Sequence, residues 1–133
     1  MRTADVESWF TTYLTDYAAM VRGDHDDLRR LLGHYHAPLL MSTDASCITL
    51  TDQEQVAAAV QRQADDLRAA DYDRSEQVTA SPVVLNRTCA THRVLLSRLR
   101  RDGSEIARLE ATYLIVEAVE GRRIAAIVVH SAP

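Results

Sequence analysis

The sequence contains no lysine, although it contains fifteen arginines. This absence excludes reactions that pass through a lysine Schiff base. Cysteine is also scarce: Cys47 and Cys89 are the two in the chain, and neither has a cysteine or histidine at the spacing of a zinc site. We therefore expect two free thiols in a reducing cytoplasm rather than a disulfide framework.

Long hydrophobic runs and a basic surface are missing as well. No apolar stretch approaches the ~20 residues that a transmembrane helix needs, and the N-terminal MRTADVESWF carries charge instead of a hydrophobic segment. The net charge is -4, and acidic residues interrupt the arginines throughout. Because no basic stripe remains, we expect a cytoplasmic protein with no membrane partner and no nucleic-acid partner.

What the sequence does contain is the composition of a globular domain. Hydrophobic residues make up 47% of the 133 residues and charged residues 26%. A chain of this length buries enough apolar surface to fold without disulfides or structural metal. No repeat, linker or low-complexity segment divides it, so we predict a single domain over residues 1–133.

Two helices are predicted at the start of the chain. Thr3 is the expected N-cap of the first, whose apolar residues recur at i, i+3 and i+4 for four turns. Gly23 should end this helix in the left-handed conformation. A second, short helix is expected over residues 24–32, with Asp26 and Asp27 in its first turn.

A small hairpin and a third helix follow. Two short apolar runs, residues 39–43 and 47–50, are separated by polar residues and predict the hairpin. Thr51 and Glu54 have the spacing of a capping box, which predicts that the third helix begins at Thr51. Its apolar stripe fades near residue 70.

The hydrophobic period then changes to two, which predicts strands over residues 77–85, 88–100, 105–119 and 122–130. Pro82 has no amide proton, so the first of these strands should lie at an edge or contain a bulge. Tight turns at Asp102-Gly103 and Glu120-Gly121 join the last three strands.

These turns fix a predicted register. Two-residue loops place Arg100 opposite Glu105 and His92 opposite Tyr113, and they put His130 on the same face as Tyr113. That face is apolar except for His92, Tyr113 and His130. A tyrosine hydroxyl beside a neutral imidazole suits hydrogen bonding to a carbonyl and proton transfer, although two such side chains can also satisfy each other in a packed core.

Both faces of the last two strands should be covered, because apolar residues occupy both parities over residues 114–119 and 124–129. Helices of the same chain can cover one face. A second copy of the protein is the simplest cover for the other, so we expect a homodimer through the outer sheet face.

The element order, three helices and then a meander of strands, indicates an α+β fold. Short anchors accompany it at Arg22-Gly23-Asp24, Leu50-Thr51-Asp52 and Gly121-Arg122-Arg123-Ile124. Over its whole length the chain resembles the nuclear transport factor 2-like superfamily, which includes ketosteroid isomerase-like and SnoaL-like proteins. The resemblance implies a cone-shaped fold, with three N-terminal helices packed on a strongly curved, mostly antiparallel sheet. It also implies an apolar pocket and dimers formed through the outer sheet face.

The resemblance also suggests roles for individual residues. Tyr113 falls where ketosteroid isomerase-type members hold an oxyanion-stabilising acid, and His130 falls where they place a pocket aromatic. Ser42 corresponds most nearly to their catalytic carboxylate, but a hydroxyl cannot serve as that base. Asp44 lies two residues away in the turn. Tyr13 flanks the first-helix position of a second oxyanion donor, as does Tyr17.

Three functions remain open at this stage. The first is binding of a small, largely apolar molecule that carries a carbonyl or hydroxyl, without turnover. The second is a cofactor-independent isomerase, cyclase or dehydratase with His92 or His130 as base and Tyr113 as hydrogen-bond donor. The third is a protein-interaction module with a vestigial pocket. The residues expected to line the pocket are Tyr13, Tyr17, Met41, Ser42, His92, Tyr113 and His130.

No cofactor and no metal are expected. His34 and His36 form an H-x-H pair, which on an extended segment would point both rings to one side. No third ligand has the spacing that a metal site requires.

Overall fold

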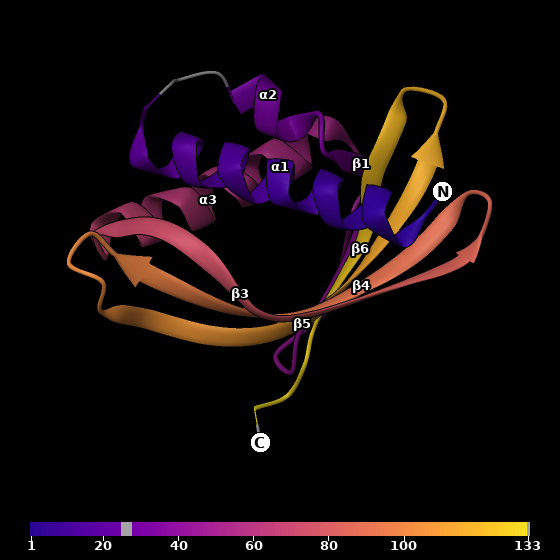
Figure 1. Ribbon diagram of the computed structural model, residues 1–133. Helices are drawn as coiled ribbons and strands as arrows, with labels where there is room; N and C mark the ends of the chain where they lie inside the picture. Colours follow the sequence, from indigo (N-terminus) through magenta and orange to yellow (C-terminus); the bar gives the residue numbers. More distant parts are fainter. Residues whose placement is uncertain (25–27, 133) are drawn as a thin grey trace.

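The computed structural model describes residues 1–24 and 28–132, and it places three helices against a single six-stranded sheet (Figure 1). The helices are α1 (Thr3–Arg22), α2 (Leu28–Leu32) and α3 (Gln53–Ala69). The strands are β1 (Tyr35–Ser42), β2 (Cys47–Leu50), β3 (Tyr72–Asn86), β4 (Cys89–Arg100), β5 (Glu105–Ala118) and β6 (Gly121–Val129).

The sheet order is β2-β1-β6-β5-β4-β3, and the pairing is antiparallel except between β1 and β6. The parallel pair joins the small N-terminal hairpin to the C-terminal meander in one sheet. This sheet curves, and all three helices lie on its concave side (Figure 1). The predicted α+β cone is therefore confirmed.

Helix α1 buries the apolar stripe that the sequence indicates. Phe10 is fully buried, and Gly23 ends the helix with φ of 81°, so that its amide donates to the Met20 carbonyl at 3.1 Å. The predicted N-cap at Thr3 is wrong by one residue: Arg2 is the N-cap, and its amide donates to the Asp5 carboxylate at 3.0 Å.

Helix α2 is described from Leu28 onward, so the predicted first turn with Asp26 and Asp27 lies outside the described residues. The start of α3 also needs a correction. Asp52, not Thr51, is the N-cap, because its carboxylate accepts from the Gln55 amide at 2.8 Å. The Thr51 amide instead donates to the Gln55 side chain at 2.9 Å.

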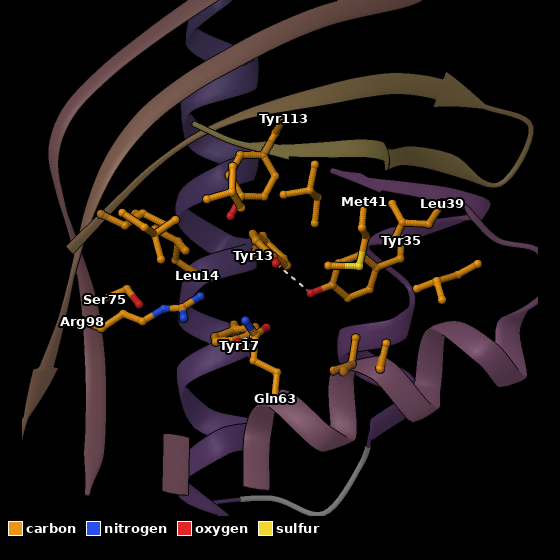
Figure 2. A pocket seen from close by; sticks show the side chains of 17 residues that line it. Tyr13, Leu14, Tyr17, Tyr35, Leu39, Met41, Gln63, Ser75, Arg98 and Tyr113 are labelled. Atoms are coloured by element: carbon orange, nitrogen blue, oxygen red, sulfur yellow. Dashed lines mark hydrogen bonds between the residues drawn. The ribbon is translucent and has the colours of Figure 1, made fainter. Parts of the chain in front are cut away.

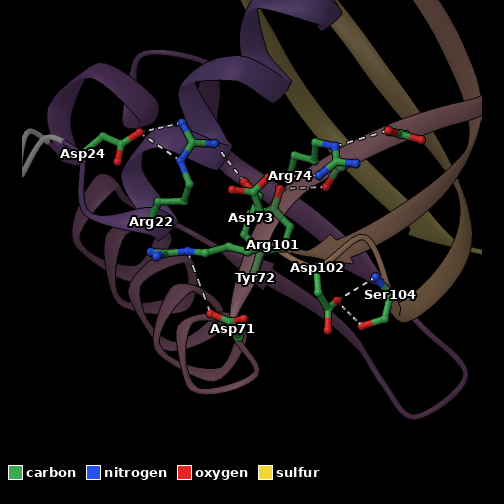
Figure 3. Close-up of polar contacts among 11 residues, drawn as sticks. Arg22, Asp24, Asp71, Tyr72, Asp73, Arg74, Arg101, Asp102 and Ser104 are labelled. Carbon is green, nitrogen blue, oxygen red and sulfur yellow. Dashed lines mark hydrogen bonds and ion pairs between the residues drawn. The ribbon is translucent and has the colours of Figure 1, made fainter.

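Strand β3 begins five residues earlier than predicted, at Tyr72, and it forms the edge of the sheet that Pro82 indicates. A polar network holds its start against the end of α1 (Figure 3). Arg22 donates to the Asp24 carboxylate at 2.6 Å and to the Asp73 carbonyl at 2.8 Å. This contact fixes the part of β3 that reaches the cavity described below.

The hairpin between β4 and β5 has a longer loop than predicted. The predicted pairing of His92 with Tyr113 is present, but Leu99 rather than Arg100 lies opposite Glu105 because the register shifts beside Arg98. Asp102 accepts from the Ser104 amide at 2.8 Å within this loop (Figure 3). Local Asp–Ser bonding thus favours a four-residue loop over the expected two-residue turn.

The hairpin between β5 and β6 departs from the predicted register in two ways. Its turn is Val119-Glu120 rather than Glu120-Gly121, because Ala118 pairs with Gly121, and β6 contains a bulge. Ile124 pairs with Ile115, whereas Ala126 pairs with Leu114, so Ala125 is an extra residue without a partner. One extra residue reverses the face of every side chain that follows. Ile127 is therefore buried opposite Tyr113.

The core lies between the helices and the concave face of the sheet. Its largest fully buried side chains are Phe10, Leu31, Leu39, Leu96, Ile115, Ile124 and His92. Within residues 1–24 and 28–132, no helix has the length and apolar character required to cross a membrane.

Candidate functional site

A cavity of about 330 Å³ lies between the concave face of the sheet and helices α1 and α3 (Figure 2). Much of its wall is apolar, and the side chains that form this part are Leu14, Leu39, Met41, Leu50, Ala59, Val60, Leu96, Leu109, Ile127 and Val129. The volume falls at the lower end of the range that small-molecule sites occupy.

Regular secondary structure explains why these residues converge. Tyr13 and Tyr17 are four residues apart on α1, so both rings lie on the face turned to the cavity. On a strand, residues two apart share a face, which brings Leu96 and Arg98 of β4 to the wall together. The bulge at Ala125 gives Ile127 the same inward direction.

Four tyrosines contribute hydroxyl groups to the cavity wall. The hydroxyls of Tyr13 and Tyr35 are 2.7 Å apart and hydrogen-bonded, and the Tyr17 hydroxyl donates to Gln63 Oε1 at 2.6 Å. The Tyr113 hydroxyl has no hydrogen-bond partner among the residues that the structure describes, although the side chain is only 5% exposed. The hydroxyl is thus a polar group on the cavity wall that no described residue bonds.

Burial keeps these phenols protonated. It raises the pKa of Tyr113 to about 12, even though the nearby Arg98 charge acts to lower it. The pKa values of Tyr13 and Tyr35 are raised well above their usual value, again mainly by burial. At neutral pH each hydroxyl is therefore a hydrogen-bond donor as well as an acceptor.

Arg98 is the charged side chain of the cavity wall. Its Nε atom is buried and has no hydrogen-bond partner, and no carboxylate pairs with its guanidinium within the described part of the chain. Ser75, which pairs with it across β3 and β4, lines the cavity beside it (Figure 2).

The structure places four of the predicted site residues on the cavity wall, namely Tyr13, Tyr17, Met41 and Tyr113. His92 is fully buried behind them and packs against Phe10, with ring centroids 4.7 Å apart. Its Nε2 atom is 3.4 Å from Gln77 Oε1, while its Nδ1 atom has no partner among the described residues. Burial lowers the pKa of His92, and the charge of Glu7 opposes this shift.

His130 and Ser42 are not brought to the cavity. Because the bulge at Ala125 reverses the end of β6, the His130 ring lies on the outer face, where its Nε2 atom is 2.7 Å from Thr112 Oγ1. Ser42 follows Met41 and points to the opposite side of β1. Asp44 is exposed in the turn and accepts a hydrogen bond from Ser131 at 2.6 Å.

The H-x-H pair does not share one ligand. His34 lies in the turn before β1 and bonds to Asp16 at 2.9 Å, whereas His36 bonds to the Pro38 carbonyl. Among residues 1–24 and 28–132, no three histidine, cysteine, aspartate or glutamate side chains are grouped to hold a metal ion.

Sequence reasoning missed Tyr35, Gln63, Ser75 and Arg98. A signal existed for Arg98, since it has the same strand parity as His92 and Leu96 and therefore belongs to the inner face. Tyr35 and Gln63 carried no such signal, because their positions depend on how β1 and α3 pack against α1.

Comparison with known proteins adds a family and a fold. The model of the family described as NTF2-like protein (DUF6841) matches residues 4–132. No curated protein sequence matches the chain. A cystatin-like protein of unknown function from Nostoc punctiforme is similar in structure, with a TM-score of 0.69 and 11% identity, covering 100% of this chain and 96% of that chain.

Two further solved structures share the fold. An NTF-2-like protein of unknown function from Shewanella oneidensis has a TM-score of 0.67 and 12% identity, covering 92% of this chain and 96% of its own. The yeast UBP3-associated protein BRE5 has a TM-score of 0.66 and 13% identity, with 94% and 95% covered. Identities this low establish the fold and leave the function open.

Proposed function

The chain belongs to the family NTF2-like protein (DUF6841), and on that premise we propose that it binds a small, largely apolar molecule carrying a carbonyl or hydroxyl. The observation that carries this proposal is the Tyr113 hydroxyl, which faces the cavity and has no hydrogen-bond partner among residues 1–24 and 28–132. A ligand oxygen could pair with this hydroxyl. The apolar wall would hold the remainder of the molecule.

A second candidate is a cofactor-independent isomerase, cyclase or dehydratase. It is favoured by the cross-strand pairing of His92 and Tyr113 and by the unpartnered Nδ1 atom of His92. In this case His92 would accept a proton while Tyr113 stabilises a developing enolate. Binding without turnover is better supported, because no histidine, aspartate or glutamate is among the described residues that line the cavity.

We also propose that the protein forms a homodimer through the outer face of the sheet. Leu40, Ala126, Leu114, Thr91 and Val83 are successive cross-strand neighbours on this face, which supports one mostly apolar row across five strands. Leu40 is 37% exposed and Val83 51% exposed. Contact with a second copy would remove this row from water.

Ligand binding is tested by isothermal titration of the native protein with a series of ketones and matched alcohols. Tyr113→Phe should weaken binding of both classes by about five- to tenfold, because it removes one hydrogen bond and little volume. Thr12→Ala is a matched control that removes an exposed α1 hydroxyl. No binding across both classes would contradict the proposal and favour an interaction module.

The enzyme candidate is tested by incubating the protein with enolisable ketones in deuterated water. Exchange of α-protons that is lost in His92→Gln would support catalysis, and absence of exchange with bound ketones would contradict it. The dimer is tested by sedimentation: Leu114→Arg should give monomers, whereas Val119→Arg, in an exposed turn, should not. A native protein that is monomeric at all concentrations would contradict the dimer.

A further inference from the structure

Arg98 brings a positive charge into the cavity that no described residue balances. It lies on the inner face of β4, where it pairs with Ser75 on one side and Ala107 on the other. Its Nε atom is buried and unbonded, and no ion pair involves it among residues 1–24 and 28–132. The side chain as a whole is only partly buried, so its guanidinium can pair with an anion that enters the cavity.

Three acidic residues on the strands next to Arg98, or at their ends, are engaged elsewhere. Asp73 and Glu76 of β3 bond to Arg74 at 3.0 and 3.2 Å, and Glu105 at the start of β5 bonds to Arg108 at 3.1 Å. No carboxylate is among the described residues that line the cavity. The charge of Arg98 instead acts on the phenols around it, where it lowers the pKa values of Tyr17 and Tyr113 against the effect of burial.

The charge of Arg98 lies toward one side of the cavity. Figure 2 shows Arg98 and Ser75 near Leu14 on one side and Leu39, Met41 and Tyr35 on the other, with Tyr13 between them. The cavity therefore has a charged side, and the opposite side combines apolar side chains with the phenol of Tyr35. Such a site complements an amphipathic molecule with one charged group.

We propose that the natural ligand of this cavity is a small organic acid whose carboxylate pairs with Arg98 and whose apolar body contacts Leu39 and Met41. The planar guanidinium fork matches a carboxylate in two parallel hydrogen bonds. A phosphate ester fits less well, because it carries up to two negative charges and no second unpaired cation lines the described cavity. This inference rests on the proposed function and specifies the charge of its ligand.

The test compares straight-chain carboxylates, from butanoate to decanoate, with primary alcohols of the same carbon number at pH 7.5. Isothermal titration of the native protein should show tighter binding of the carboxylate than of its alcohol. Arg98→Met, which keeps the apolar stem, should weaken carboxylate binding by about tenfold or more and change alcohol binding by less than about threefold. Arg74→Met is the matched control, since Arg74 is 43% exposed and paired with two carboxylates.

Several results would contradict the inference that the ligand is an organic acid. Alcohols that bind as tightly as carboxylates, or carboxylate binding that is equal in the native protein and Arg98→Met, would overturn it and leave the proposed function intact. An equal loss of carboxylate affinity in Arg74→Met would also overturn it, because the loss would then reflect the net charge of the protein and not a contact with Arg98. No binding of either series would contradict both proposals. Arg98→Met keeps the apolar stem of the side chain and is expected to fold. The comparison of carboxylate with alcohol in the native protein does not depend on that variant.

Discussion

Replacing His92 by leucine is expected to remove a specific part of the pH dependence of folding stability. His92 is fully buried, and burial lowers its pKa below the usual 6.5. The unfolded chain therefore binds the proton first as the pH falls. The contribution of the neutral His92 side chain to folding stability is fully present above pH 6.5. It is lost as the pH falls from 6.5 toward the lower pKa of His92 in the folded protein.

The size of the effect follows from the same linkage. One group contributes at most about 1.4 kcal/mol per pH unit, so the native protein should lose up to about 1.4 kcal/mol through His92 between pH 7.5 and 5.5. Groups common to both proteins cancel in the comparison. At pH 7.5 the two proteins should differ by less than about 1.5 kcal/mol, since leucine is similar in volume and removes the unpartnered Nδ1 atom.

Urea denaturation at the two pH values measures this difference directly. His36→Gln is the control, because among the described residues His36 bonds to the nearby Pro38 carbonyl alone, close to the surface. It should follow the native profile. Parallel loss of stability in the native protein and His92→Leu would refute the reasoning, because it would mean that the His92 ring is protonated equally easily in the folded and unfolded chains.

Three further outcomes are expected. Phe10→Ala should reduce the free energy of unfolding by about 3–5 kcal/mol, because it leaves a cavity in the core between His92 and Tyr113. Thr11→Ala, on the exposed side of α1, should reduce it by less than about 1 kcal/mol, and similar losses in the two variants would contradict this packing. Asp52→Ala should lower the melting temperature by the equivalent of about 1 kcal/mol, because it removes the N-cap of α3. A larger decrease in Thr51→Ala would contradict the assignment of Asp52 as the N-cap. All five tyrosines have pKa values raised by burial, so tyrosinate absorbance of the native protein should stay low at pH 10.5. The free energy of unfolding should fall above pH 10, because the unfolded chain loses its phenolic protons before the folded protein does. Full absorbance in the folded protein at that pH would contradict this burial.

The sequence was sufficient to predict the elements that local chemistry determines. The apolar repeat of α1, the left-handed Gly23 and the edge position that Pro82 requires are present in the structure. Each depends on residues close together in the chain. The cross-strand pair of His92 and Tyr113 is present as predicted although the predicted loop is wrong, because the register shift beside Arg98 offsets the longer loop.

The cavity was only partly predictable, because its wall depends on packing over long distances in the chain. Tyr35 reaches Tyr13 across 22 residues and Gln63 reaches Tyr17 across 46. Neither contact has a sequence signature. The register of β6 failed for a different reason: nothing in a run of small apolar residues marks Ala125 as unpaired, so strict alternation gave the wrong direction for His130.

The unpaired Ala125 also means that the residues lining the cavity depend on the register of β6 as well as on the amino-acid sequence. If Ala125 paired regularly, with no bulge and no change of length, the inward set would be Val128 and His130 in place of Ile127 and Val129. Loss of the bulge in the last strand is thus a route by which a related chain could acquire an imidazole inside the cone. Alignments that treat this stretch as gapless would assign its inner and outer residues the wrong way round.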